Sequence, residues 1–373
     1  MITALKDARL VLPDGIVSPG ALLWEDGRIL ACGREEELDL SRAESIIDAK
    51  GLLAGPGFVD IHCHAGGEFW AYENPVAVAR HHLAGGTTSM LLTMYHQQTP
   101  EEILRAAGWI REAMESRTPG NIAGIHMEGP YLSPKYGAHV SSARKPDPAE
   151  YEEYLRVFGD LVGQWTYSPE VEGTEAFAKR LKEEGITMAI GHSEANYEQV
   201  TRAVENGATI CTHITDATGN SGKPFSDGTK AVSFDMACLG TPCMYLEMIN
   251  DCLGAHVLPE MSRIIVRLAG VDRIIGITDA CTGTAEPGTD INMVNGELYG
   301  SLLTMIDSAR NFANNTKLSA EEVFRVCATN PARAIGLTDV GTLEPGKRAN
   351  LVLVDEAAGW TLEGVFLDGE KVC

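Results

Sequence analysis

The central part of the chain alternates between amphipathic segments and short apolar ones rich in Ile, Val, Met and Thr, a composition typical of buried β-strands. The apolar segments lie at residues 58–62, 87–94, 121–128, 162–168, 186–192, 208–213, 243–249 and 273–279. The amphipathic segments between them, such as residues 100–116 and 173–185, predict helices with one polar face. Strands that alternate with helices in this way favour an α/β fold, a parallel (β/α)8 barrel of the TIM type. A doubly wound open sheet is the alternative, although no Gly-x-Gly-x-x-Gly loop follows the first strand.

Both ends of the chain have a different pattern, in which short apolar runs are separated by turns. The pairs Asp14-Gly15 and Asp26-Gly27 are signals of tight hairpins. Residues 340–373 repeat this pattern of short strands and turns. We therefore predict one small β domain built from residues 1–52 and 340–373, and a barrel domain from residues 53–339.

Composition and charge narrow the class of protein. The 373 residues include 30 Lys and Arg against 52 Asp and Glu, a formal net charge of −22, which argues against binding to nucleic acid or anionic membranes. No apolar run approaches the ~18 residues of a membrane span. The nine cysteines contain no Cys-x-x-Cys pair, which indicates reduced, mostly buried thiols. We therefore expect a cytoplasmic protein with a small-molecule substrate.

Ionisable residues stand at the ends of the predicted barrel strands. They are His62, His64, Glu128, His192, His213 and Asp279. The two histidines that are two residues apart face the same side of an extended strand. The intervals from His64 onward are 64, 64, 21 and 66 residues. Since one βα unit takes roughly 30 residues, these intervals place the side chains after strands 1, 3, 5, 6 and 8. Barrel active sites form at that face, so we expect the six side chains to converge there.

This combination of side chains indicates a metal-dependent hydrolase. Several imidazoles together with carboxylates suit Zn²⁺ or Fe²⁺ better than Mg²⁺. Such an ion lowers the pKa of a bound water to about 7 and polarises a carbonyl group. A carboxylate outside the ligand set can then act as general base and acid, and Asp279 is the candidate for that role. The predicted reaction is hydrolysis of an amide or a similar C–N bond.

Five motifs along the chain carry a family resemblance: PGFVDIHCHAGG, HMEGPYLSPKYGAH, GHSEANY, THITDA and TNPARAIGL. Together they resemble the amidohydrolase superfamily, and within it the N-acetylglucosamine-6-phosphate deacetylases, over nearly the whole chain. The resemblance implies a barrel with a small β-sandwich formed from both termini. It also implies removal of the acetyl group from an N-acetyl amino sugar by attack of a metal-bound hydroxide.

The resemblance implies a metal-ligand set by position. Glu128, His192 and His213 match the core ligands of the family. His62 and His64 match a pair that supports a second ion in some members, bridged by the glutamate. The resemblance therefore implies one or two divalent ions per subunit, Zn²⁺ or Fe²⁺.

The resemblance also implies residues that act on the substrate. Asp279 matches the catalytic acid and base, and His139 matches a residue near the substrate carbonyl. His256 resembles a histidine that contacts the sugar or its phosphate. Asp216 and Ala217 occupy the place of a pair whose backbone lies beside the phosphate. The family is typically dimeric, which makes a homodimer the expected assembly.

Two departures from the family pattern concern the phosphate. Asp216 stands where the family has an asparagine, and a carboxylate repels a phosphate. Residues 219–234 lack the phosphate-binding arginine of the family and offer only Lys223 and Lys230. We therefore expect an altered phosphate pocket, with an unphosphorylated N-acyl amino sugar or another N-acyl compound as the substrate. The alternatives are an N-acyl-D-amino acid or cyclic amide hydrolase, and a non-catalytic sugar-binding barrel.

Overall fold

Eight apolar segments from the middle of the chain form one parallel sheet in the order in which they occur in the sequence. The computed structural model describes residues 1–94, 97–137, 142–222, 226 and 228–373. The strands are β6 (Phe58–Asp60), β9 (Thr87–Met94), β10 (Ile122–Glu128), β11 (Val162–Tyr167), β12 (Thr187–Ile190), β13 (Ala208–Cys211), β14 (Tyr245–Ile249) and β15 (Ile274–Ile277). Each strand lies within a segment that the apolar pattern predicts as a strand.

Backbone hydrogen bonds next to β6 and β15 close this sheet into a barrel. The Asp279 N–H donates to the His62 carbonyl oxygen at 2.9 Å. The N–H groups of His64 and Ala65 both donate to the Ala280 carbonyl oxygen, at 3.0 and 2.8 Å. The segments that follow the first and last barrel strands therefore lie against each other, and the predicted (β/α)8 barrel is confirmed.

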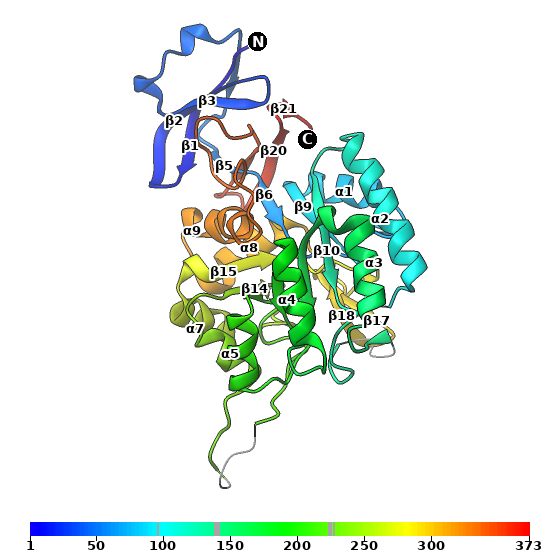
Figure 1. The fold of residues 1–373 in the computed structure, drawn as a ribbon. Helices are drawn as coiled ribbons and strands as arrows, with labels where there is room; N and C mark the ends of the chain where they lie inside the picture. Colours follow the sequence, from blue (N-terminus) through cyan, green and yellow to red (C-terminus); the bar gives the residue numbers. More distant parts are fainter. Residues whose placement is uncertain (95–96, 138–141, 223–225, 227) are drawn as a thin grey trace.

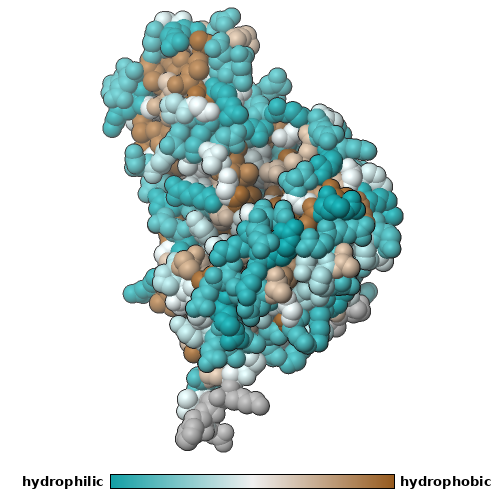
Figure 2. Space-filling model, viewed as in Figure 1, coloured by the Kyte–Doolittle hydropathy of each residue, from teal (hydrophilic) through white to brown (hydrophobic). Residues whose placement is uncertain are grey.

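Helices wrap the outside of the barrel (Figure 1). They are α1 (Pro75–Ala84), α2 (Pro100–Glu115), α3 (Pro148–Phe158), α4 (Thr174–Glu184), α5 (Tyr197–Glu205), α6 (Phe234–Leu239), α7 (Pro259–Ala269), α8 (Met305–Thr316), α9 (Ala320–Phe324), the π-helix η6 (Arg325–Thr329) and α10 (Asn330–Ala334). Local chemistry determines where α2 begins, because Thr99 and Glu102 form a capping box. Helix α4 ends at Gly185, which adopts a left-handed conformation with φ 73°. The outer faces of α3 and α4 are largely hydrophilic (Figure 2), as their amphipathic patterns require.

Strands from both chain ends form a second sheet, which lies beyond one end of the barrel (Figure 1). They are β1 (Thr3–Leu12), β2 (Gly15–Glu25), β3 (Arg28–Arg34), β4 (Ser45–Asp48), β5 (Leu53–Pro56), β19 (Leu351–Asp355), β20 (Thr361–Leu367) and β21 (Glu370–Lys371). The order is β21-β20-β19-β5-β1-β2-β3, with β4 beside β1. Asp26 and Gly27, at φ 49° and 74°, make the predicted hairpin turn. The β-rich unit formed from both termini is thereby confirmed. Because β5 pairs with β1 and β19, this unit extends past residue 52, where the sequence pattern places its limit.

Two small sheets lie close to the end of the barrel where β6 and β15 finish. Strands β7 (Ala65–Gly66) and β8 (Phe69–Trp70) form one. Strands β16 (Thr284–Ala285), β17 (Ile291–Val294) and β18 (Glu297–Ser301) form the other. The Ser301 N–H donates to the Asp279 carbonyl oxygen at 3.0 Å, so β18 lies beside the segment that follows β15. In the parts of the chain that the structure covers, no helix has the length and apolar character needed to cross a membrane.

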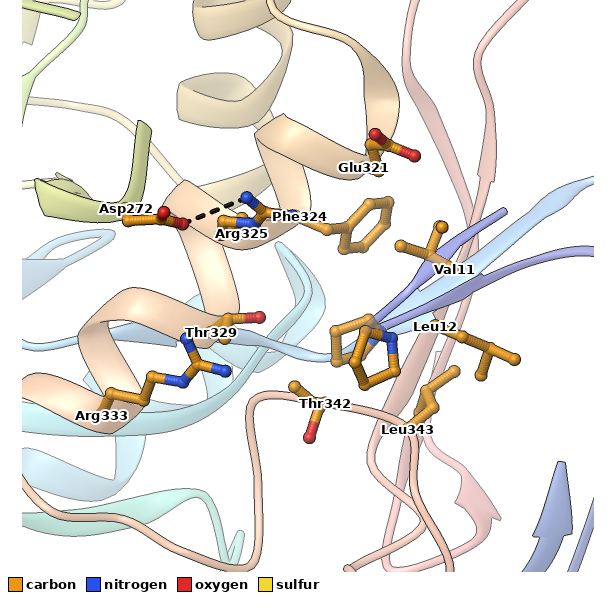
Figure 3. Close-up of a pocket in the computed structure, with 13 residues that line it drawn as sticks. Val11, Leu12, Asp272, Glu321, Phe324, Arg325, Thr329, Arg333, Thr342 and Leu343 are labelled. Atoms are coloured by element: carbon orange, nitrogen blue, oxygen red, sulfur yellow. Dashed lines mark hydrogen bonds and ion pairs between the residues drawn. The ribbon is translucent and has the colours of Figure 1, made fainter. Parts of the chain in front are cut away.

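A cavity of about 250 Å³ lies between the β-rich unit and the barrel (Figure 3). Val11 and Leu12 from β1 line one side, and Phe324 and Arg325 line the other. Arg325 forms an ion pair of 3.1 Å with Asp272. Among the described residues, the buried groups of potential metal ligands lie elsewhere, at and just beneath the end of the barrel where the strands finish. The candidate site is therefore built there.

Candidate metal centre

The six side chains that the sequence predicts to converge come together at one end of the barrel. Glu128 ends β10, and the other five follow β6, β12, β13 or β15 within four residues. All six are buried: His62, His64, Glu128, His192, His213 and Asp279. Burial of so many ionisable groups is costly unless they compensate one another or bind an ion. The free-energy cost of burying these six groups must therefore be offset by contacts among them or by a bound ion.

Three of these residues have strained backbone conformations. His192, His213 and Asp279 have φ values of 47°, 26° and 47°, in the left-handed region that non-glycine residues seldom adopt. Each lies two residues after the end of a barrel strand, where the chain turns out of the sheet. Such conformations persist only where the surrounding structure enforces them, and they are concentrated at functional sites.

The carboxylate of Glu128 lies at the middle of the cluster. Its Oε1 is 2.9 Å from Nε2 of His192, 3.1 Å from Nε2 of His213 and 3.3 Å from Nε2 of His62. Its Oε2 is 3.2 Å from Nε2 of His64. One carboxylate therefore faces four imidazoles, with its two oxygens directed to different parts of the cluster. This arrangement fits a carboxylate that would hold a divalent cation together with the imidazoles.

Backbone carbonyls determine which nitrogen of His192 and His213 carries the hydrogen. Nδ1 of His192 lies 3.2 Å from the Tyr136 carbonyl oxygen, and Nδ1 of His213 lies 3.2 Å from that of Asp216. Because a carbonyl oxygen only accepts, each Nδ1 is the donor. In the neutral ring this leaves a lone pair on Nε2, and the two Nε2 atoms are 3.1 Å apart beside Oε1 of Glu128. Converging lone pairs and a carboxylate fit a cation.

A buried glutamate orients His62 in the same way. Oε2 of Glu247, on β14, lies 3.2 Å from Nδ1 of His62, and its Oε1 accepts from Nε2 of Gln164 at 2.7 Å. Nε2 of His62 then faces Nε2 of His64, at 3.2 Å. Glu247 was not predicted from the sequence, although a single acid within the apolar segment 243–249 is a signal that could have revealed it. Carboxylates that hold the far nitrogen of a ligating imidazole are typical of metal sites.

Asp279 joins the cluster on the side of His62 and His64. Its Oδ1 lies 3.1 Å from Nε2 of His64 and 3.3 Å from Nε2 of His62. Burial would raise the pKa of the Asp279 carboxyl, but the charges of both imidazoles and a hydrogen bond from His64 keep this pKa below its ordinary value. Asp279 is therefore ionised near neutral pH.

The carboxylates also favour positive charge on the imidazoles. Burial lowers the pKa of His213, but the hydrogen bond and charge of Glu128 outweigh this and raise it to about 9. Burial also lowers the pKa of His62, but the negative charges of Glu128 and Asp279 outweigh this effect and raise the pKa well above its ordinary value. The carboxylates that favour protonated imidazoles also supply negative charge that a divalent cation would compensate.

In the described ranges of the chain, two of the four groups of ligand atoms that have the spacing of metal sites share Glu128. One is Glu128, His192 and His213, and the other is His62, His64 and Glu128; within each group the atoms lie no more than 4.8 Å apart. Nitrogen and carboxylate donors of this kind fit Zn²⁺ or Fe²⁺. The residues present therefore fit a divalent metal ion.

A pocket opens beside this centre and includes three of the residues expected to contact substrate: Asp216, Ala217 and His256. Leu298, Tyr299 and Gly300 of β18 also line it. His139, the fourth expected contact, lies outside the described residues, as does Lys223. No Lys or Arg lines the pocket within the described part of the chain.

Asp251 fixes His256 at the edge of this pocket. Its Oδ2 accepts from the His256 backbone N–H at 2.9 Å and lies 3.1 Å from Nδ1 of the ring. Burial lowers the pKa of His256, but this hydrogen bond and the nearby carboxylates raise it above its ordinary value. Nε2 has no hydrogen-bond partner among the residues that the structure describes. Oδ1 of Asp251 also accepts from the backbone N–H groups of Leu253 and Ala255, at 3.1 and 2.8 Å. Asp251 was not predicted from the sequence.

The sequence of this chain is similar to a known protein family and to several named proteins. The sequence profile of the amidohydrolase family matches residues 53–372. The N-acetylglucosamine-6-phosphate deacetylase of Lysinibacillus sphaericus is 28% identical over 87% of this chain and 91% of its own. The N-acetylgalactosamine-6-phosphate deacetylase of Escherichia coli is 28% identical over 99% of both chains.

Solved structures show the same relationship in three dimensions. One is a variant of the N-acetyl-D-glucosamine-6-phosphate deacetylase of Mycobacterium smegmatis in complex with N-acetyl-D-glucosamine-6-phosphate. It is similar to this chain with a TM-score of 0.86 and 29% identity, over 100% of this chain and 99% of that one. The similarity therefore extends over both the barrel and the β-rich unit.

Proposed function

The chain belongs to the amidohydrolase family, and we propose that within this family it is a metal-dependent deacetylase of N-acetyl amino sugars. The observation that carries the proposal is the position of Asp279. Its carboxylate lies 3.1 Å from His64 in the metal centre and also lines the substrate pocket. A base in this position reaches both an ion-activated water and the amide of a bound substrate. The deacetylase names of the relatives support the same reaction.

The proposed ligands of the catalytic ion are Glu128, His192 and His213. When bound, a divalent cation activates a water for attack and polarises the acetyl carbonyl. Tyr136 and Asp216 hold the two imidazoles through their backbone carbonyls, so that each Nε2 faces Glu128, where it would hold the ion.

Asp279 carries the proton through the proposed reaction. Its ionised carboxylate accepts a proton from the attacking water as the new C–O bond forms at the acetyl carbon. The protonated carboxyl then donates this proton to the sugar nitrogen as the C–N bond breaks. The products are acetate and the free amino sugar, and Asp279 returns to its ionised form.

We propose that the substrate is bound without the phosphate that the relatives' names specify. Asp216 contributes a carboxylate to the pocket, and the described residues that line it include no Lys or Arg. His256 presents Nε2 as the polar contact for a sugar hydroxyl. A neutral N-acetyl amino sugar fits this charge pattern better than its 6-phosphate.

A substrate panel tests this proposal. The purified protein is loaded with Zn²⁺ or Fe²⁺, and acetate release is measured on N-acetylglucosamine, N-acetylgalactosamine, their 6-phosphates and several N-acetyl-D-amino acids. We expect equal amounts of acetate and free amine from the sugars, with the unphosphorylated forms preferred. Turnover of N-acetyl-D-amino acids alone would contradict the substrate class, and absence of acetate from every compound would contradict the reaction.

A cytoplasmic location is also part of the proposal. All nine cysteines are free thiols, and five of them are buried. Free thiols in this number are typical of a reducing compartment.

A further inference from the structure

Cys281 lies against the metal centre, and its thiol has no role in the proposed reaction. It follows Asp279 by two residues and is 7% exposed. Its Sγ lies within 4.8 Å of the ligand atoms of both His64 and Asp279, and all three residues are buried. The same thiol lines the pocket beside the centre. A soft sulfur donor is therefore placed among the nitrogen and oxygen donors of a candidate metal site.

The fold holds this thiol in position from two sides. The Cys281 N–H donates to the Ser301 carbonyl oxygen at 2.9 Å, and the Ser301 N–H donates to the Asp279 carbonyl oxygen at 3.0 Å. Gly300, at φ 53°, packs directly against the sulfur, because a Cβ there would lie 2.7 Å from Sγ and 2.5 Å from the Asp279 carbonyl oxygen. Only glycine leaves the space that Cys281 occupies, so β18 and Asp279 together fix the sulfur beside the centre.

The number of donors in the cluster exceeds what one ion takes. Zn²⁺ and its analogues bind about four ligands in a tetrahedral site. Glu128, His192 and His213, with a water, complete one such site. Four further groups then remain on the other side of Glu128: the imidazoles of His62 and His64, the Asp279 carboxylate and the Cys281 thiol.

We propose that Cys281 binds, as a thiolate, a second divalent cation that His64 and Asp279 also ligate. The inference extends the metal centre of the proposed function but does not depend on which amide is hydrolysed. When the ion binds, the sulfur forms the metal–sulfur bond and the thiol proton leaves to solvent. A thiolate among imidazole and carboxylate ligands directs this position toward Zn²⁺, Fe²⁺ or Co²⁺ and away from Mg²⁺ and Ca²⁺.

Cobalt substitution tests the assignment by a signal that only a sulfur ligand produces. Metal-free protein is titrated with Co²⁺, and the absorption spectrum is recorded with the wild type, Cys281→Ser and the matched control Cys63→Ser. Cys63 is also buried and stands between His62 and His64, but its Sγ contacts His82 at 3.1 Å, away from the pocket. Because Cys63 is a second buried thiol next to the two histidines, it is the other residue that could produce a sulfur-to-cobalt band.

The wild type and Cys63→Ser are expected to show a sulfur-to-cobalt charge-transfer band that develops with the second equivalent of Co²⁺. Cys281→Ser should lose this band and bind the second equivalent at least about tenfold more weakly. X-ray absorption of the two-metal wild type should show a sulfur neighbour at about 2.3 Å, which needs no variant. Circular dichroism on each variant confirms that the fold is retained.

Three results would overturn the assignment. The wild type could bind only one equivalent of Co²⁺, or bind two equivalents without showing the sulfur-to-cobalt band. The third result is a band that survives in Cys281→Ser and disappears in Cys63→Ser. Acetate release is followed on the same samples. A sulfur band in a protein without deacetylase activity would support the ligand and reject the proposed reaction, so the two failures are distinguishable.

Discussion

Glu247 on β14 holds the ring of His62, which follows β6, through a contact of 3.2 Å between Oε2 and Nδ1. Both side chains are fully buried, and 185 residues of chain separate them. The contact leaves Nε2 of His62 directed at Glu128 and His64. A carboxylate outside the proposed ligand set therefore orients an imidazole of the candidate metal centre and favours a hydrogen on its Nδ1.

Replacing Glu247 by Gln should weaken metal binding without removing a ligand. The amide cannot stabilise the Nδ1–H of His62 as a carboxylate does, and we expect affinity to fall by about 10- to 100-fold. Competition with a chromogenic chelator measures this change. Glu175→Gln, at an exposed glutamate paired with Lys179, is the control and should leave affinity unchanged. Equal affinities for Glu247→Gln and the wild type would remove Glu247 from this role.

Asp279→Asn should greatly reduce catalysis and leave the fold intact. The amide cannot accept the proton of the attacking water, so we expect kcat to fall by about 10²- to 10⁴-fold. The ion at Glu128, His192 and His213 should remain, as should the melting temperature to within a few degrees. Acetate release and metal content on the same preparation measure both effects. A variant that keeps most of its turnover would show that another group moves the proton.

The Asp251–His256 pair predicts a dependence of stability on pH. Hydrogen bonds from the His256 ring and backbone outweigh burial and lower the pKa of Asp251 to about 2, against about 3.9 in an unfolded chain. A lowered carboxyl pKa contributes stability above the unfolded value, and that stability is lost as the pH falls toward 2. Asp251→Asn should therefore lower the free energy of unfolding by about 2 kcal/mol above pH ~4 and by almost nothing near pH ~2.

Urea unfolding of wild type and Asp251→Asn, both with chelator present so that metal loss does not contribute, measures this difference. Asp272→Asn, at an exposed carboxylate that pairs with Arg325, is the control for a general effect of charge. A difference between wild type and Asp251→Asn that stays constant from neutral pH to pH ~2 would contradict the low pKa of Asp251.

Asp216→Asn should shift substrate preference toward phosphorylated sugars. Removing the carboxylate removes its repulsion of a phosphate, and we expect the ratio of kcat/KM for the 6-phosphate over the free sugar to rise about tenfold. The backbone carbonyl of Asp216, which accepts from His213, is unchanged by the substitution. An unchanged or lower ratio would mean that the carboxylate does not face the position of the phosphate.

The sequence predicted the barrel and the convergence of its site because both follow from local patterns. Apolar runs predict strands, and a side chain just after a parallel strand must lie at the end of the barrel where that strand finishes. His62 and His213 are 151 residues apart, but each is placed by its own strand. Pattern and spacing were therefore sufficient for the residues that end strands.

The sequence did not predict the residues that act through distant contacts. Glu247 matters because of its contact with His62, and Cys281 because Gly300 lets it approach the centre. A single acid in an apolar segment marks Glu247 as unusual but does not name its partner. Both contacts join elements that only the closed barrel brings together. The β-rich unit extends past the predicted limit at residue 52 for the same reason. Strand β5 belongs to this unit because it pairs with β1 and β19, and local sequence patterns do not show that pairing.

The most direct test of the whole account is acetate release from N-acetylglucosamine and N-acetylgalactosamine before and after metal removal. We predict that chelation abolishes acetate release and that Zn²⁺ or Fe²⁺ restores it in the wild type. Neither ion should restore it in His192→Ala. Acetate release that continues in the fully metal-free protein, or that His192→Ala retains, would contradict a metal centre built on Glu128, His192 and His213.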